Sequence, residues 1–161
     1  MNHYQLDRRS ETAVHSWPFR CYLRFLSDNT GYSWRILAVA MDVAASNLQP
    51  IVEFAPGYLF LPKSLGRRIL DFTPNSLLRL GAEQIPAKEV RNLYIELRLR
   101  GASHRELAAQ CHMSNCQLDD LIVGNHLTCS RWIKWTLLAL LEVYGIKCMA
   151  MRNPIPEPYA A

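Results

Sequence analysis

The sequence predicts an all-α fold that is built from two similar helical units. Three observations predict it: apolar residues recur at helical spacing, Ser and Gly stand where helices begin and end, and one segment is repeated. Half of the 161 residues are hydrophobic and 20% are charged, which supplies enough apolar side chains for a core. The only β-like run, at 58–61, is short.

The repeat sets the predicted organisation of the chain. Residues 31–38, Gly-Tyr-Ser-Trp-Arg-Ile-Leu-Ala, return 70 positions later as Gly-Ala-Ser-His-Arg-Glu-Leu-Ala at 101–108. The matching residues are mostly small or apolar, as a shared core requires, and a match of 64–70 with 132–138 follows after a shift of about two residues. We therefore expect an N-terminal arm at 1–13, a first unit at 14–73, a linker at 74–87, a second unit at 88–150 and a disordered tail at 151–161.

In the first unit, the initial helix is predicted over 17–27 and is followed by a turn. Ser33 is expected to cap the second helix, because its hydroxyl can accept from a free backbone amide. Pro50 lies within the third helix and is expected to disrupt it unless that helix begins late. A fourth helix is predicted over 62–72. The inward residues of the second and third helices are expected to be Ile36, Leu37, Ala40, Met41, Leu48, Ile51 and Val52.

The second unit follows the same plan. A helix predicted over 90–100 stops at Gly101, a residue that tolerates positive φ. Ser103 is expected to cap the next helix in a capping box with Glu106, and Ser114 to cap the third helix. The inward residues are expected to be Leu107, Ala108, Cys111, Leu118, Leu121 and Ile122.

A long fourth helix is predicted over 130–144 and is expected to end at Gly145. It is apolar on nearly all sides, so it must be covered on nearly all sides. The face that its own unit leaves free could pack on the first unit or form a dimer interface, two alternatives that the sequence leaves open. The candidate partner contacts are Trp132, Trp135 and Tyr144.

The second unit resembles a known DNA-binding family. Ser103-x-x-Glu-Leu-Ala, then Met113-Ser114, then Leu118-x-x-Leu-x-x-Gly resembles the helix-turn-helix of Cro/C1-type (lambda-repressor-like) domains, and 33–51 resembles a weaker copy. The resemblance covers roughly 14–72 and 88–145. It implies two tandem helix-turn-helix units of four to five helices each. It also implies a bacterial-type transcriptional regulator that binds double-stranded DNA, with no cofactor.

The resemblance also implies which residues contact DNA. In that family the exposed start of the third helix, the recognition helix, contacts base edges in the major groove. The residues in these positions are Ser46, Asn47, Gln49, Ser114, Asn115 and Gln117. Phosphate contacts are expected where the second and fourth helices begin. The residues in those positions are Trp34, Lys63, Arg67, His104, Arg131 and Lys134.

The alternative is a helical interaction module, for instance an antiactivator that has lost DNA binding and pairs with another regulator or with a second copy. Asp119 and Asp120 place negative charge on the second recognition helix, and neither recognition helix carries an arginine among its contact positions. The net charge of +4 permits a polyanionic partner without requiring one. Residues 1–80 hold nine basic and six acidic groups, whereas 81–161 hold nine and eight.

Other functional classes have weaker support in the sequence. Cys111, Cys116, His126 and Cys129 have the side chains that zinc prefers, but core or surface thiols are the expected roles. Five cysteines without a CxxC pair disfavour a disulfide framework. Motifs typical of enzymes are missing, so we expect no enzyme. Neither a signal peptide nor a spanning helix is predicted, so we expect a soluble cytoplasmic protein without a membrane partner.

Overall fold

Helices dominate the structure. The computed structural model describes residues 13–53 and 60–152, with side chains as far as Gly145 in the last helix. These ranges hold nine helices and four strands of three residues each, so the predicted all-α class is confirmed. Almost all of the predicted N-terminal arm, and the predicted tail from Asn153 onward, lie outside the described residues.

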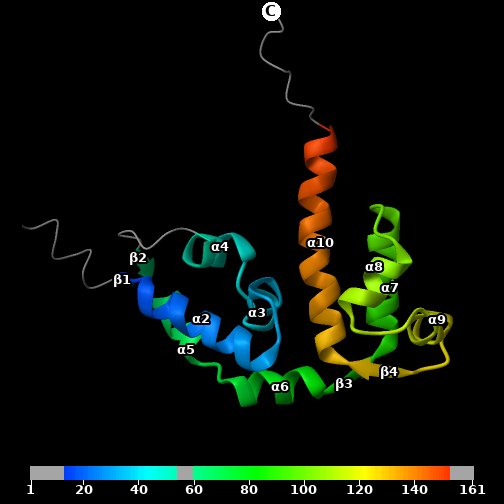
Figure 1. Ribbon diagram of the computed structural model, residues 1–161, viewed down its shortest axis with the longest axis horizontal. Coiled ribbons are helices and arrows are strands. Elements are labelled where there is room, and N and C mark those ends of the chain that lie inside the picture. The colour runs from blue at the N-terminus through cyan, green and yellow to red at the C-terminus, as the bar shows by residue number, and fades with distance from the viewer. Residues whose placement is uncertain (1–12, 54–59, 153–161) are drawn as a thin grey trace, which may run out of the picture. The chain divides into compact units, whose positions relative to one another are not determined.

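The chain divides into two compact units, unit 1 up to residue 80 and unit 2 from residue 81. Both units have the same order of elements, strand, three helices, strand and helix, which can be followed in Figure 1. Unit 1 contains β1 (Ala13–His15), α2 (Trp17–Thr30), α3 (Trp34–Ala40), α4 (Ala45–Glu53), β2 (Phe60–Pro62) and α5 (Lys63–Leu70). Unit 2 contains β3 (Gln84–Pro86), α7 (Ala87–Leu99), α8 (His104–Gln110), α9 (Asn115–Val123), β4 (Thr128–Ser130) and α10 (Arg131–Arg152).

The segment predicted as a linker, 74–87, is mostly regular structure. It holds α6 (Pro74–Ala82), within which the boundary between the units falls, and then β3. Thr73 and Ser76 cap α6 reciprocally, because each side-chain oxygen accepts from the other residue's amide, at 3.2 and 2.9 Å. The sequence analysis did not anticipate this helix.

Corresponding helices of the two units are separated by nearly the same number of residues in the sequence. α3 and α8 begin and end 70 positions apart, as do α4 and α9, and the fourth helices begin 68 positions apart. The same caps start the second helices: the Ser33 hydroxyl accepts from the amide of Ile36 at 3.4 Å, and the Ser103 hydroxyl from that of Glu106 at 3.1 Å.

The turns between the second and third helices also correspond. Asp42 and His112 have φ values of 54° and 49°, and they are the only non-glycine residues with positive φ in the described part of the chain. Each turn is closed by the same backbone bond, from Val43 N to Ala38 O and from Met113 N to Ala108 O, both 2.9 Å. This left-handed residue reverses the chain within the turn, and the backbone bond behind it fixes where the third helix begins.

One predicted capping box forms at a different serine. The Glu106 carboxylate does not return to the Ser103 amide, because it accepts a hydrogen bond of 2.5 Å from the Tyr144 hydroxyl on α10. The box forms instead at the start of α9. There Ser114 and Gln117 each accept from the other's backbone amide, at 3.2 and 2.8 Å.

The helix pairs of both units bury the same positions. All of these side chains are at most 3% exposed. They are Leu37, Ala38, Met41, Leu48 and Ile51 in unit 1, and Leu107, Ala108, Cys111, Leu118 and Leu121 in unit 2. The small alanine at the second position of each set lets the two helices approach closely. Among the residues predicted to point inward, Ile36, Ala40, Val52 and Ile122 are only partly buried.

Four short strands were not predicted. β1 pairs with β2, and β3 with β4, both antiparallel. The central residues Leu61, Ile85 and Cys129 are buried between more exposed neighbours, which is the alternation of a strand. Of the β-like run at 58–61, Phe60 and Leu61 lie in β2, and the other two residues lie outside the described ranges.

Two expected helix breaks do not occur. Pro50 lies inside α4, which continues to Glu53. The amide that proline lacks would have bonded to Ser46 O, and Ser46 is exposed, so water can satisfy that carbonyl. α10 continues through Gly145 to Arg152, because glycine tolerates right-handed helical geometry at a modest energetic cost.

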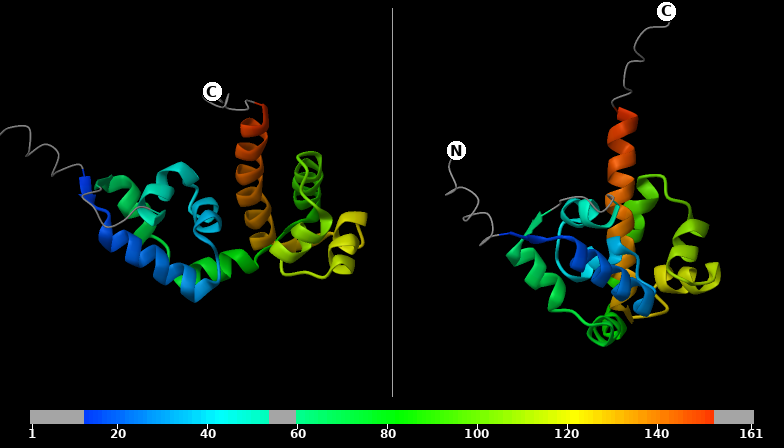
Figure 2. Two further views of the ribbon diagram at one scale, coloured as in Figure 1. Left: turned by 45° about the horizontal axis from the view of Figure 1, so that its top comes forward. Right: turned by 60° about the vertical axis from the view of Figure 1, so that its left-hand side comes forward.

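In unit 2, α10 packs along α7 (Figure 1, Figure 2). Together with α8 and α9 these helices enclose the unit's core, which includes Leu97, Leu107, Leu118 and Leu137. Across the described ranges, no helix combines the length and the apolar character needed to span a bilayer.

The left-handed turn residue gives a stability prediction. Since glycine adopts positive φ without strain, His112→Gly should be more stable than His112→Ala by about 1 kcal/mol. Both variants lose the contact of the His112 ring with Trp132, so the comparison isolates the backbone. Asn92, an exposed residue within α7, serves as the control position. There Asn92→Ala should be more stable than Asn92→Gly by about 1 kcal/mol, because alanine favours a helix. Urea unfolding measures both differences, and a more stable alanine at His112 would contradict the turn geometry.

Candidate nucleic-acid interface

The predicted base-contact residues lie near the exposed starts of α4 and α9. Ser46, Asn47 and Gln49 are exposed in unit 1, and so are Ser114, Asn115 and Gln117 in unit 2. Buried Leu48 and Leu118 hold the two helices against their units. The structure therefore presents each group on the outer side of its helix.

The polar side chains of α9 are partly engaged. Ser114 and Gln117 form the capping box, which uses the Ser114 hydroxyl and the Gln117 amide oxygen. Asn115 has no side-chain hydrogen bond to a described residue and is the most available of the three. Asp119 and Asp120 are exposed further along α9, so this helix carries negative charge near its candidate contact surface.

The polar side chains of α4 differ from those of α9. Gln49 donates from its amide nitrogen to the Glu53 carboxylate at 2.7 Å, one turn further along. Ser46 and Asn47 form no side-chain hydrogen bond with a described residue. The start of α4 therefore offers neutral donors and acceptors, with its first acidic side chain at Glu53.

His104, predicted to contact phosphate, instead ties three helices together. Its Nδ1 atom lies 2.8 Å from the Tyr94 hydroxyl on α7. Its Nε2 atom lies 3.4 Å from both the Asn115 carbonyl and the Asp119 carboxylate on α9. A ring that accepts at Nδ1 and donates at Nε2 satisfies these partners, so a phosphate at His104 would have to compete with contacts inside unit 2.

In unit 1 the corresponding residue is Trp34, which is partly exposed at the start of α3. The Arg35 guanidinium lies 4.4 Å from the centre of the Trp34 ring and forms a cation–π contact. This pair places a positive charge at the start of α3 in unit 1. At the corresponding start of α8 in unit 2, the His104 ring instead contacts Tyr94 and Asp119.

At the start of α10 the two basic residues predicted to hold phosphate are paired with acids. Arg131 lies 2.7 Å from the Glu83 carboxylate, and Lys134 lies 2.5 Å from the Glu89 carboxylate. These carboxylates partly neutralise both cations, so a phosphate would have to compete with them for Arg131 and Lys134.

The predicted phosphate contacts of α5, Lys63 and Arg67, are exposed and form no ion pair with any described residue. Lys63 begins the helix as expected, whereas Arg67 lies in its last turn. Their neighbour Arg68 is engaged differently. Its Nε atom donates to Met41 O at 2.8 Å, and its guanidinium lies 3.7 Å from Asp42. Arg68 thus fastens α5 to the turn before α4, a role that the sequence analysis missed because a long-range contact defines it.

The predicted partner residues on α10 are buried or partly buried in the structure. Tyr144 is 8% exposed and belongs to the core of unit 2, Trp132 packs partly buried against that core, and Trp135 is 8% exposed. Other apolar side chains of unit 2 are exposed by 53–81%, and the sequence analysis did not single them out. They are Ile95, Leu99, Val123 and Leu127.

Three of the four candidate zinc ligands, Cys111, His126 and Cys129, line one pocket, and Cys116 does not. Cys111 and Cys129 are buried, whereas Cys116 and His126 are exposed. No group of three or more His, Cys, Asp or Glu residues could hold a metal ion within the described residues. Burial, and then the proximity of Cys129, raises the pKa of the Cys111 thiol to about 12, so this thiol stays protonated near neutral pH.

No protein-family model, curated protein or solved structure matches this chain.

Thiol reactivity tests the arrangement of the cysteines. Near neutral pH, iodoacetamide should alkylate the exposed Cys116 and Cys21 and leave Cys111 unmodified, because Cys111 is buried and protonated. After unfolding in urea, all three should react at similar rates. Peptide mass spectrometry measures the modification of each site. Equal labelling of Cys111 and Cys116 in the folded protein would contradict the buried position of Cys111.

Proposed function

We propose that the chain is a sequence-specific DNA-binding transcriptional regulator, and that unit 1 makes the main contact with DNA. The choice of unit 1 rests on one observation. Lys63 at the start of α5 and Arg67 in its last turn form no ion pair with a described residue, whereas Arg131 and Lys134 at the start of α10 are paired with carboxylates.

Unpaired cations matter because affinity for DNA comes largely from neutralising phosphates and releasing their counterions. A lysine that already contacts a carboxylate must first give up that contact, so it gains less from a phosphate. The distribution of charge agrees with this choice, since residues 1–80 hold nine basic and six acidic groups, against nine and eight in the rest.

The chemistry of the recognition helices favours the same unit. α4 offers Ser46 and Asn47 without competing side-chain hydrogen bonds to described residues, and asparagine can pair with adenine through two hydrogen bonds. α9 carries exposed Asp119 and Asp120, which repel nearby phosphates.

A specific observation favours a second role for unit 2. Val123 and Leu127 are 78% and 81% exposed near the end of α9, and the exposed Asp119 and Asp120 lie on the same helix. Such a mixture of apolar and acidic side chains suits a protein partner better than DNA. The candidate partners are a second copy of the chain and another regulator. If DNA binding fails, this interaction role is the alternative function of the whole chain.

Phosphate contacts are tested by charge removal. Lys63→Ala with Arg67→Ala should weaken binding to all duplexes and reduce the slope of log affinity against log salt by about 2, one for each lost phosphate contact. The matched control, Arg131→Ala with Lys134→Ala, removes the same number of charges from unit 2 and should leave the slope unchanged. Fluorescence anisotropy at two salt concentrations measures both. A larger effect of the control pair would place the DNA contact on unit 2.

Base contacts are tested separately, with duplexes selected from a random pool. Asn47→Ala should weaken binding to selected duplexes by about 1–3 kcal/mol while changing affinity for random duplexes little. Asn115→Ala, at the exposed start of α9, serves as the control and should preserve discrimination. If the protein binds no duplex even at low salt, the regulator proposal fails and the interaction role of unit 2 remains.

A further inference from the structure

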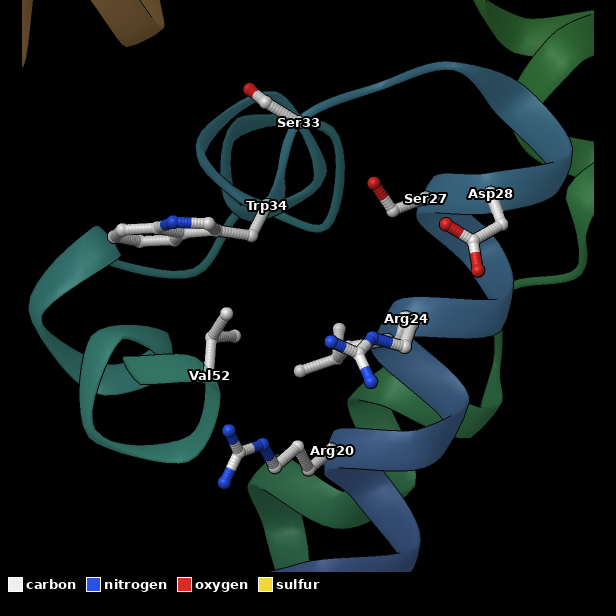
Figure 3. A pocket seen from close by; sticks show the side chains of 8 residues that line it. Arg20, Arg24, Ser27, Asp28, Ser33, Trp34 and Val52 are labelled. Atoms are coloured by element: carbon white, nitrogen blue, oxygen red, sulfur yellow. The ribbon is translucent and has the colours of Figure 1, made fainter. Parts of the chain in front are cut away.

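Unit 1 contains a pocket of about 250 Å³ between α2 and the α3–α4 pair (Figure 3). Leu23 and Arg24 line it from α2, Trp34 from α3 and Val52 from α4. An engineered cavity of about 150 Å³ is large enough to bind benzene, so this volume admits a planar molecule of one or two rings.

Charged and apolar groups face one another across the pocket. Figure 3 shows the Arg20 and Arg24 side chains extending from α2 toward α4, where Val52 lies below the Trp34 ring. Arg24 is exposed and forms no ion pair with a described residue, and that includes Asp28, which also lines the pocket. The Arg24 guanidinium is therefore available to an external anion.

The corresponding positions of unit 2 carry different side chains. At the positions 70 residues further on, Val90 replaces Arg20 and is fully buried, and Tyr94 replaces Arg24. The Tyr94 hydroxyl bonds to His104, the counterpart of Trp34, at 2.8 Å. Unit 1 thus has two guanidinium groups where unit 2 has an apolar side chain and an internal hydrogen bond.

We propose that this pocket binds a small aromatic carboxylic acid of one or two rings. The Trp34 ring, Leu23 and Val52 supply apolar contact for a planar ring system. Arg24 supplies a planar pair of N–H donors that matches a carboxylate. Arg35 covers Trp34 without lining the pocket, so the tryptophan ring is held by a residue that the ligand does not displace.

The proposal goes beyond DNA binding and does not depend on it. A ligand in the pocket contacts α2, α3 and α4 together, so it stabilises unit 1 by joining the helix pair to the first helix. The test uses the full chain without DNA, so its failure leaves the proposed function untouched.

The probe is indole-3-acetate, titrated into the full chain while the indole N–H resonances of the four tryptophans are followed by NMR. We expect a saturable shift that is largest for Trp34. Arg24→Met should weaken binding at least tenfold, because it removes the guanidinium and keeps most of the side-chain volume. Arg79→Met, an exposed arginine on α6 that does not line the pocket, is the matched control and should bind as the unmodified chain does.

Three further measurements keep the proposal open to refutation. Indole-3-acetamide has the same rings without the charge and should bind at least tenfold more weakly. Val52→Phe fills the pocket and should abolish binding while thermal unfolding verifies that the variant is folded. Inorganic phosphate should not compete. No saturable shift of Trp34 at millimolar probe, equal binding of the acetamide, or competition by phosphate would each overturn the proposal.

Discussion

Both units depend on one backbone constraint, a left-handed residue in the turn between the second and third helices. Asp42 and His112 hold that conformation, and the amides that follow them bond back to Ala38 and Ala108. The bond fixes the start of the third helix, and the buried alanine permits the close approach that places Leu48 or Leu118 in the core. Once this turn is set, the outer residues of α4 and α9 are exposed as a consequence of helix geometry.

The two units use this common backbone with different polar chemistry. Unit 2 satisfies its polar side chains internally, through His104 on α8 and through Glu106, which accepts from Tyr144. Unit 1 carries Trp34 and Arg24 at positions that correspond to His104 and Tyr94. A polar group that is satisfied within its own unit stabilises that unit and contributes little to an external ligand, since the two uses compete for the same donors and acceptors.

The sequence predicted the fold class and the buried positions of the helix pairs because local signals determine them. Serine caps act over three residues, and apolar side chains recur at helical spacing. The strands were missed because three residues provide too short an alternation to recognise, and each strand pairs with a segment far along the chain. The capping box was misplaced for a related reason. Glu106 accepts from Tyr144, 38 positions away, and sequence spacing does not reveal that competitor. The exposure of the base-contact residues was predictable, but the ion pair of Lys134 with Glu89 was not.

A duplicated fold permits the division of roles that the proposals describe. A binding surface carries a stability cost, because unpaired cations repel one another and a pocket forgoes contacts that a packed core would make. In a protein with a single unit, that cost would lower the stability of the whole fold. With two units, one can keep closed polar contacts such as Tyr94 with His104, while the other keeps Arg24 and Lys63 available. If both proposals hold, the same positions serve stability in unit 2 and ligand contact in unit 1, and the difference in charge between the units reflects these two uses.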